Sequence, residues 1–235
     1  MAGLEYDFSV TNLGECKIKS PIELSRHHGD FRATFVRDDA YVRRVVNSYD
    51  EKPEAITPEA NHLEKAGPRE YIYFNPEHVT AGICTCGGLC PGLNDVIRAV
   101  VRTLWNRYGV RRIKGIKFGY QGFFAENGFE PVDLNPDNID EIHKIGGTYL
   151  GTSRGGGDRT SEIVDSIVKM GINMMFIIGG DGTQRGSLDI ANEVQRRGLD
   201  IAVVGIPKTV DNDLQFIDRS FGFETAVQQG TKAVA

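Results

Sequence analysis

At residues 177–183 the chain reads Ile-Ile-Gly-Gly-Asp-Gly-Thr, where a short apolar run that begins at Met174 stops at two glycines. Apolar residues then recur every three positions, at Leu188, Ala191 and Val194. This change of pattern predicts a buried strand, a tight turn and a helix that starts with free backbone amides.

The turn contains the groups that a phosphate and a metal ion require. Free amides and the helix dipole attract phosphate oxygens, and glycines let those oxygens come close. The carboxylate of Asp181 is placed to hold a divalent cation. Taken alone, the same residues also fit an ordinary glycine-rich turn between a strand and a helix.

Length and composition are those of a globular protein with an excess of glycine. A chain of 235 residues forms one large domain, or one domain with an extension. Glycine accounts for 28 of the 235 residues, about 12% against an average of roughly 7%. Most of this excess lies in clusters after Thr85, which indicates backbone that closely approaches a ligand.

Charge and hydropathy exclude two classes of partner. A net charge of −5 argues against a nucleic-acid surface, and no run approaches the ~20 apolar residues that span a bilayer. The first ten residues, MAGLEYDFSV, lack the basic region of a secretory signal. We therefore expect a cytoplasmic protein without nucleic-acid or membrane partners.

Three of the four cysteines fall in the segment 84–90, CTCGGLC. Its spacing is not the paired C-x-x-C of structural zinc, and no histidine cluster completes it. We expect reduced, half-buried cysteines and solvated side chains at His27, His28 and His62.

Residues 1–70 differ in character from the rest. They are charged, with short apolar patches such as Tyr41-Val42 and scattered prolines. We expect an N-terminal extension that packs on the body of the protein, followed by a nucleotide-binding α/β domain over residues 71–235.

Beyond residue 78, strand and helix patterns alternate. Strand patterns occupy residues 79–85, 112–118, 174–178 and 201–206. Besides the helix after residue 183, the sequence predicts a helix with an apolar face between Leu93 and Leu104 and a short helix over 136–144. It also predicts a helix that Thr160 or Ser161 can cap, with apolar positions at Ile163, Ile167 and Val168, and a last helix from about Phe223. The fold class is thus α/β: a Rossmann-like, open, mainly parallel sheet with helices on both faces.

Four loops are predicted at the carboxyl edge of this sheet, where such folds bind ligands. They are CGGLCPG (86–92), GTSRGG (151–156), GGDGT (179–183) and PKTVDND (207–213). The first is neither a Walker A loop nor the dinucleotide fingerprint. In an extended fourth loop, Asp211 and Asp213 face one site; the alternative is a turn in which Asp and Asn side chains bond to their own loop.

Together, these four loops resemble those of the 6-phosphofructokinase family, in order and with fitting intervals from about Tyr73 onward. The sequence is most similar to the plant and trypanosomatid type of ATP-dependent enzyme, which is related to the pyrophosphate-dependent branch. The resemblance implies Mg²⁺-assisted transfer of a phosphoryl group from ATP to fructose 6-phosphate, a glycolytic reaction. It also implies a homo-oligomer, dimer or tetramer, and an allosteric enzyme.

The resemblance assigns the nucleotide side of the reaction to the first three loops. Gly88 offers a backbone amide to the donor phosphates. Arg154 and Gly155 contact the nucleotide, and Arg154 also steadies the charge on the moving phosphoryl group. The nucleotide is lined by Gly180, Asp181, Gly182 and Thr183, and Asp181 holds magnesium.

The resemblance assigns the sugar side to the fourth loop. Thr209, Val210 and Asp211 contact fructose 6-phosphate, with Asp211 as proton acceptor for its 1-hydroxyl, and Asp213 orients the loop. Residues that grip the sugar's 6-phosphate are expected beyond Ala235. The apolar helical pattern of residues 226–234 also leads us to expect a longer chain.

Two positions bear on the phosphoryl donor. Pyrophosphate-dependent relatives usually have Asp at the position of Gly182, where its charge would repel the α-phosphate of ATP. Lys208, in contrast, is typical of pyrophosphate users. We give Gly182 the greater weight and expect ATP, with a pyrophosphate-dependent enzyme as the alternative.

Two other classes share part of the pattern. NAD kinases and diacylglycerol kinases have a GGDGT loop but lack the PKTVDND and GTSRGG segments. A nucleotide-binding regulatory subunit would have lost catalytic groups, whereas Asp181, Arg154 and Asp211 are all present.

Overall fold

The computed structural model describes residues 8–25, 33–43 and 62–234. The chain divides into two compact units, Met1–Tyr73 and Phe74–Ala235. That the first seventy residues pack on the body stays a prediction. His27 and His28 lie outside the described residues.

The first unit contains two small antiparallel strand pairs. They are β1 (Ile18–Lys19) with β4 (Tyr71–Ile72), and β2 (Tyr41–Arg43) with β3 (His62–Glu64). The half-buried ring of His62 stacks on Tyr41 at a centroid distance of 5.8 Å, which ties the second pair together.

The second unit is built on a five-stranded sheet in the order β7-β6-β5-β8-β9. The strands are β5 (Thr80–Thr85), β6 (Arg112–Ile116), β7 (Val132–Asp133), β8 (Met174–Gly179) and β9 (Ala202–Pro207). All pairings are parallel except that of the short edge strand β7, which the sequence patterns did not reveal. The prediction of a mainly parallel α/β sheet is confirmed.

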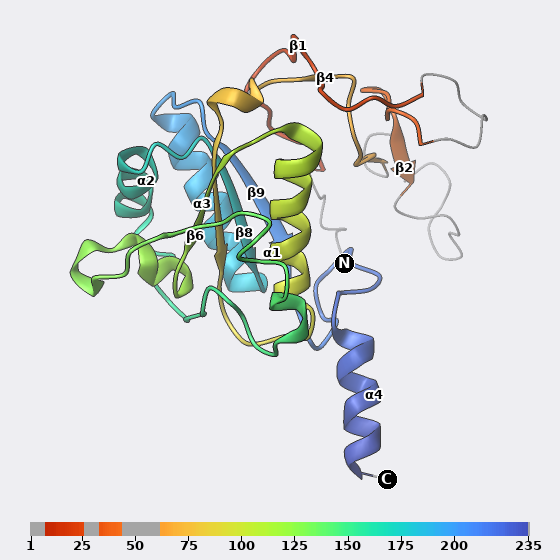
Figure 1. Ribbon diagram of the computed structural model, residues 1–235, viewed down its shortest axis with the longest axis vertical. Coiled ribbons are helices and arrows are strands. Elements are labelled where there is room, and N and C mark those ends of the chain that lie inside the picture. Colours follow the sequence, from red (N-terminus) through yellow and green to blue (C-terminus); the bar gives the residue numbers. More distant parts are fainter. Residues whose placement is uncertain (1–7, 26–32, 44–61, 235) are drawn as a thin grey trace, which may run out of the picture. The chain divides into compact units, whose positions relative to one another are not determined.

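Helices cover both faces of the sheet (Figure 1). The α-helices are α1 (Leu93–Arg102), α2 (Thr160–Lys169), α3 (Asp181–Arg196) and α4 (Phe223–Val234). A π-helical turn, Thr103–Tyr108, continues α1, and short 3₁₀ helices occupy Pro76–His78, Gly119–Phe123, Ala125–Asn127 and Ile142–Lys144. None of the described helices combines the length and apolar character needed to cross a bilayer.

Two apolar clusters fix these helices to the sheet. On one face, Ile83 of β5 is buried in the same cluster as Ile97 and Val101 of α1. On the other, Ile177 of β8 is buried with Ile163 of α2 and other residues of α2 and α3. Because the parallel strands are buried on both sides, they read in the sequence as continuous apolar runs.

The buried face of α3 differs from the predicted one. Leu188 is 61% exposed, whereas the buried positions of the helix are Thr183, Gly186, Ser187, Ile190 and Val194. Small residues are buried because Tyr120 occupies the space beside them: a Cβ at residue 186 would lie 3.0 Å from its hydroxyl oxygen. In α2, Val168 belongs to the apolar pattern of the sequence but is 48% exposed.

Two predictions about local structure are wrong for reasons of side-chain bonding. Neither Thr160 nor Ser161 caps α2; Arg159 precedes the helix, and no side chain bonds to its first amides. Residues 136–144 form only the 3₁₀ turn at their end. The side-chain oxygen of Asn135 accepts hydrogen bonds from the backbone amides of Asp137 (2.9 Å) and Asn138 (3.1 Å). These bonds favour a turn over a helix.

Ion pairs join the middle of α2 to the end of α3. Arg197, just after α3, places Nη1 2.5 Å from Asp165 Oδ1 of α2 and Nε 2.6 Å from Glu193 Oε1. Glu193 also accepts two hydrogen bonds of 2.7 Å from Arg196. These bonds lower the pKa of Glu193 from 4.5 to about 2.

We expect Glu193→Gln to lower the thermal unfolding midpoint at pH 7. Because the folded-state pKa is depressed, the stabilisation is present above about pH 4.5 and is lost as the pH falls toward about 2. The difference between wild type and variant should shrink over that window. Glu130→Gln removes a charge from an exposed glutamate and is the control; equal effects of the two substitutions would contradict this expectation.

Candidate active site

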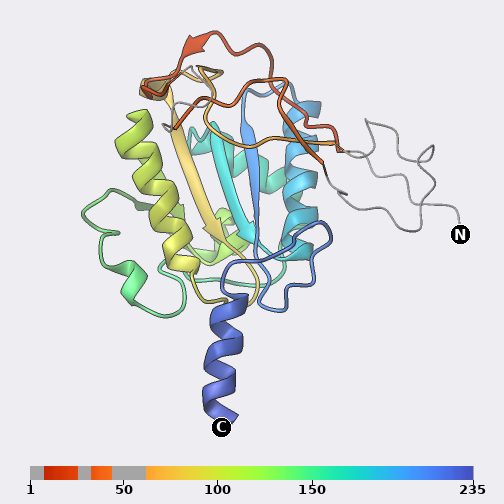
Figure 2. The same cartoon turned by 90° about the vertical axis from the view of Figure 1, so that its right-hand side faces the viewer.

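Backbone hydrogen bonds join the four predicted loops at the carboxyl edge of the sheet. The amide of Cys86 donates to the carbonyl of Ile178 at 2.8 Å, and that of Gly87 to Ser153 at 2.8 Å. The amide of Lys208 donates to the carbonyl of Gly179 at 2.9 Å. Figure 2 shows α4 extending from this end of the sheet, to which the parallel strands point.

Two cations lie beside the first loop. The ammonium of Lys208 donates to the carbonyl of Gly88 at 2.6 Å. Arg154 Nη2 lies 3.9 Å from the position that a Cβ on residue 88 would take. The structure therefore brings Gly88, Arg154 and Lys208 together from three separate loops.

Arg154 and Gly155 are exposed. Within the described ranges, the guanidinium of Arg154 makes no hydrogen bond or ion pair. The backbone before it is tied down, because Thr152 Oγ1 donates to the carbonyl of Gly87 at 2.7 Å and Ser153 Oγ to that of Phe118 at 2.5 Å. The backbone of this loop is therefore fixed, while the guanidinium of Arg154 is available to an anionic ligand.

The turn at residues 179–183 joins β8 to α3 as predicted. A Cβ on Gly179 would lie 2.5 Å from Cβ of Thr183, so the turn requires glycine there. Gly180 precedes the helix, and no side chain bonds to the first amides. Space around Gly182 is open, with no atom within 4 Å of a Cβ built on it. Thr183 is buried, and its carbonyl accepts the hydroxyl of Tyr120 at 2.8 Å.

Asp181 is the first residue of α3, and its carboxylate is largely exposed. Arg185, one turn later, places Nη2 2.5 Å from Asp181 Oδ2. Among the described residues no group of three or more His, Cys, Asp and Glu side chains is arranged to hold a metal. Asp181 therefore offers one oxygen ligand, and a cation there needs its other ligands from water or a bound anion.

The fourth loop is a turn and not the extended segment that the spacing suggested. Asn212 has a left-handed backbone, φ = 55°, and its side chain accepts the amide of Ser220 at 2.6 Å. Thr209 Oγ1 donates to the carboxylate of Asp213 and accepts the amide of Asp211 at 3.2 Å. The alternative of a turn in which Asp and Asn side chains bond to the backbone and side chains nearby is thus confirmed.

Asp211 and Asp213 consequently have different surroundings. Asp213 is engaged by Thr209, which is buried. The Asp211 carboxylate is exposed and accepts no hydrogen bond from any residue that the structure describes. Val210, which precedes Asp211, is half-buried. Of the two carboxylates, Asp211 is the one available to a ligand.

Lys208 is buried, which lowers its pKa, and the nearby charge of Arg154 lowers it further. Cys90 is buried as well, which raises the pKa of its thiol, while Lys208 acts in the opposite direction. Cys84 and Cys86 are also buried, with their sulfur atoms 4.0 Å apart. The expectation of half-buried side chains at these three positions is wrong, because all three are enclosed by the fold, Cys84 and Cys86 within the apolar cluster between the sheet and α2 and α3.

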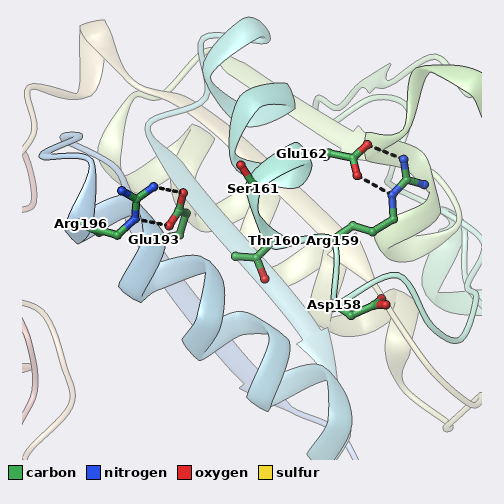
Figure 3. A pocket seen from close by; sticks show the side chains of 7 residues that line it. All are labelled: Asp158, Arg159, Thr160, Ser161, Glu162, Glu193 and Arg196. Atoms are coloured by element: carbon green, nitrogen blue, oxygen red, sulfur yellow. Dashed lines mark hydrogen bonds and ion pairs between the residues drawn. The ribbon is translucent and has the colours of Figure 1, made fainter.

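A cavity of about 550 Å³ lies elsewhere, between the start of α2 and the end of α3 (Figure 3). It is lined by Asp158, Arg159, Thr160, Ser161, Glu162, Glu193 and Arg196. Its two arginines are paired with glutamates, Arg159 with Glu162 at 2.8 Å and Arg196 with Glu193 at 2.7 Å. It contains none of the predicted site residues and has no cation free for an anionic ligand.

Two polar residues near the site were not predicted from the sequence. Asn94 is buried on α1 and Thr85 ends β5, and both bond to the loop that leads to Arg154. A signal existed for Asn94, because it is a polar residue next to Leu93 at the start of an apolar helix face.

Comparisons with known proteins bear on this site. A family model described as phosphofructokinase matches residues 80–235. An ATP-dependent 6-phosphofructokinase of Borreliella burgdorferi is 55% identical over 229 residues, which are 97% of this chain and 50% of that protein. ATP-dependent 6-phosphofructokinase 7 of Arabidopsis thaliana is 54% identical over 80% of this chain and 39% of its own. The chain thus spans half or less of the length of these curated relatives.

Solved structures share the fold at lower identity. Phosphofructokinase from Saccharomyces cerevisiae matches with a TM-score of 0.57 and 23% identity, over 66% of this chain and 23% of that one. The Pichia pastoris enzyme in the T-state matches with a TM-score of 0.60 and 22% identity, over 80% of this chain and 20% of its own.

Proposed function

This chain belongs to the phosphofructokinase family, and from that membership we propose that the protein transfers a phosphoryl group from ATP to the 1-hydroxyl of fructose 6-phosphate. The observation that supports this most directly is the meeting of the four loops at one sheet edge. Phosphoryl transfer needs positioning and charge neutralisation more than covalent chemistry. Backbone amides, a free guanidinium and exposed carboxylates are suited to those tasks.

The donor side of the reaction is assigned to the first three loops. Gly88 donates its amide to the donor phosphates, and Arg154 with Gly155 contacts the nucleotide. The guanidinium of Arg154, which no described residue engages, lies beside Gly88, a position suited to neutralising charge on the moving phosphoryl group. The start of α3, from Gly180 to Thr183, lines the nucleotide, and its uncapped amides favour anionic oxygens.

Magnesium is assigned to Asp181. The residues present fit this ion, because Mg²⁺ is commonly held by one or two carboxylates together with substrate phosphates and water. When bound, the ion neutralises charge on the donor phosphates. Asp181 must first release Arg185, and since that pair is exposed it costs little to break.

The sugar side is assigned to the fourth loop. Thr209, Val210 and Asp211 contact fructose 6-phosphate, and the carboxylate of Asp211 accepts the proton of its 1-hydroxyl. Asp213 orients the loop through its bond to Thr209. An exposed, unpartnered carboxylate is free to approach a substrate hydroxyl, which is the first requirement of a general base.

ATP is the proposed donor, with pyrophosphate as the alternative. Open space at Gly182 supports ATP, because the α-phosphate needs room there. Lys208 does not oppose it, since its ammonium is already bonded to Gly88. Four relatives with 50% identity or more are named ATP-dependent enzymes. We also propose a cytoplasmic, allosteric homo-oligomer, dimer or tetramer, in glycolysis.

Steady-state kinetics of the full-length protein test the function. We expect fructose 6-phosphate to be phosphorylated with Mg²⁺·ATP, and kcat/KM with pyrophosphate to be far lower. Omission of Mg²⁺ should abolish turnover. A preference for pyrophosphate would refute the proposal that ATP is the donor. Phosphorylation of NAD or diacylglycerol, without activity on the sugar phosphate, would refute the proposal that fructose 6-phosphate is the acceptor.

A further inference from the structure

The side chain of Asn94 is enclosed by the loop that precedes Arg154. Asn94 is 4% exposed. Its Nδ2 donates to the carbonyls of Ile142 (3.0 Å) and Ile145 (2.9 Å), and its Oδ1 accepts the amide of Tyr149 (2.6 Å). One amide therefore joins two points of the chain on either side of an exposed pair of glycines, residues 146–147.

Thr85 holds the next part of the same loop. Its hydroxyl is fully buried, donates to the carbonyl of Gly151 at 2.7 Å and lies 2.9 Å from the hydroxyl of Thr148. Beyond that point, the amide of Gly87 donates to the carbonyl of Ser153 at 2.8 Å. The backbone is thus fixed at successive points from Ile142 to Ser153.

Arg154 follows this fixed backbone directly. No described carboxylate or carbonyl holds its guanidinium, so the direction of the side chain depends on where the loop places its Cα atom. Loosely held catalytic groups are costly, since a misplacement of about 1 Å can lower a rate by about 10²-fold.

We propose that Asn94 is a positioning residue for Arg154: it sets the path of residues 145–149 and, with Thr85, the place from which the guanidinium reaches the transferred phosphoryl group. This rests on the proposed function, in which Arg154 contacts the donor. Asn94 itself touches no substrate. Its contribution to the rate therefore passes through Arg154.

A double-mutant cycle in the full-length protein tests the proposal. Asn94→Asp keeps the size and the acceptor but removes both donors to the loop. We expect kcat to fall by roughly 10- to 10²-fold, with KM for fructose 6-phosphate little changed. In an Arg154→Ala background the same substitution should change kcat by less than about twofold, the usual scatter of additive effects.

Asn173→Asp is a matched control at the opposite edge of the sheet. Asn173 also bonds to two backbone groups, the amide of Thr80 at 2.9 Å and the carbonyl of His78 at 3.3 Å. The substitution Asn173→Asp should lower the unfolding midpoint but should not lower kcat. Should Asn94→Asp fail to fold, Thr85→Val tests the same loop from β5 and should give the same dependence on Arg154.

The outcomes separate the two proposals. Equal losses of kcat with and without the Arg154 side chain, or a loss from Asn173→Asp as large as that from Asn94→Asp, would overturn the role of Asn94. Wild-type protein without sugar-phosphate kinase activity would instead overturn the proposed function.

Discussion

Replacing Asp211 by asparagine in the full-length protein is expected to lower kcat by roughly 10²–10⁴-fold, the usual contribution of a general base. Asparagine keeps the shape and polarity of the side chain but cannot accept the proton of the sugar hydroxyl at neutral pH. The backbone bond from Asp211 to Thr209 is unaffected by the change, so the loop should keep its conformation. ATP affinity should change little.

Two further variants show whether the effect belongs to Asp211. Asp213→Asn keeps an acceptor for the hydroxyl of Thr209 and should lower kcat far less. In the structure, the Asp213 side chain is bonded to Thr209 and holds the loop. Asp181→Ala should weaken Mg²⁺-dependent nucleotide binding. Rates and equilibrium binding of Mg²⁺·ATP are the measurements. A near wild-type kcat for Asp211→Asn would remove Asp211 from the role of base.

Gly182→Asp is expected to weaken the binding of ATP by tenfold or more. Nothing lies within 4 Å of a Cβ at this position, so the side chain fits without disturbing the fold. Two unit charges about 4 Å apart repel by about 4 kcal/mol at an effective dielectric constant near 20. Since each ~1.4 kcal/mol is one decade of affinity, repulsion of the α-phosphate is large enough to exclude ATP.

Pyrophosphate lacks that third phosphate and should be affected less. Lys208, whose ammonium is bonded to the carbonyl of Gly88 in the first loop, already places a positive charge beside the donor phosphates, so the variant is expected to gain some pyrophosphate activity. The ratio of kcat/KM for the two donors, in wild type and variant, is the measurement. Gly182→Ala adds a Cβ without charge and should leave the ratio unchanged. A wild type that prefers pyrophosphate would mean that Lys208 is the determining residue.

Much of the fold could be predicted because its signals are local. Short apolar runs identified the four parallel strands, and helical spacing identified α1, α2, α3 and α4. Their alternation fixed a parallel sheet, whose geometry places every strand-to-helix loop at one edge. The meeting of the four loops therefore followed from the order of elements along the chain.

Other features depend on specific contacts that the spacing of apolar residues does not reveal. Leu188 has helical spacing, yet the buried side of α3 is decided by the ring of Tyr120 against Gly186. Residues 136–144 have a helical pattern, yet the side chain of Asn135 bonds the backbone into a turn. In both cases a single tertiary or side-chain contact outweighs a weak local preference.

The sequence by itself determined which groups reach the site: two cations, three carboxylates and glycine turns at one sheet edge. The tertiary structure decided which of them are free. Asp213 is bound by Thr209 while Asp211 is not, and Lys208 is bound by Gly88 while Arg154 is not. The physical reason is that hydrogen bonding in a turn depends on backbone angles such as the left-handed φ of Asn212, which residue spacing does not encode.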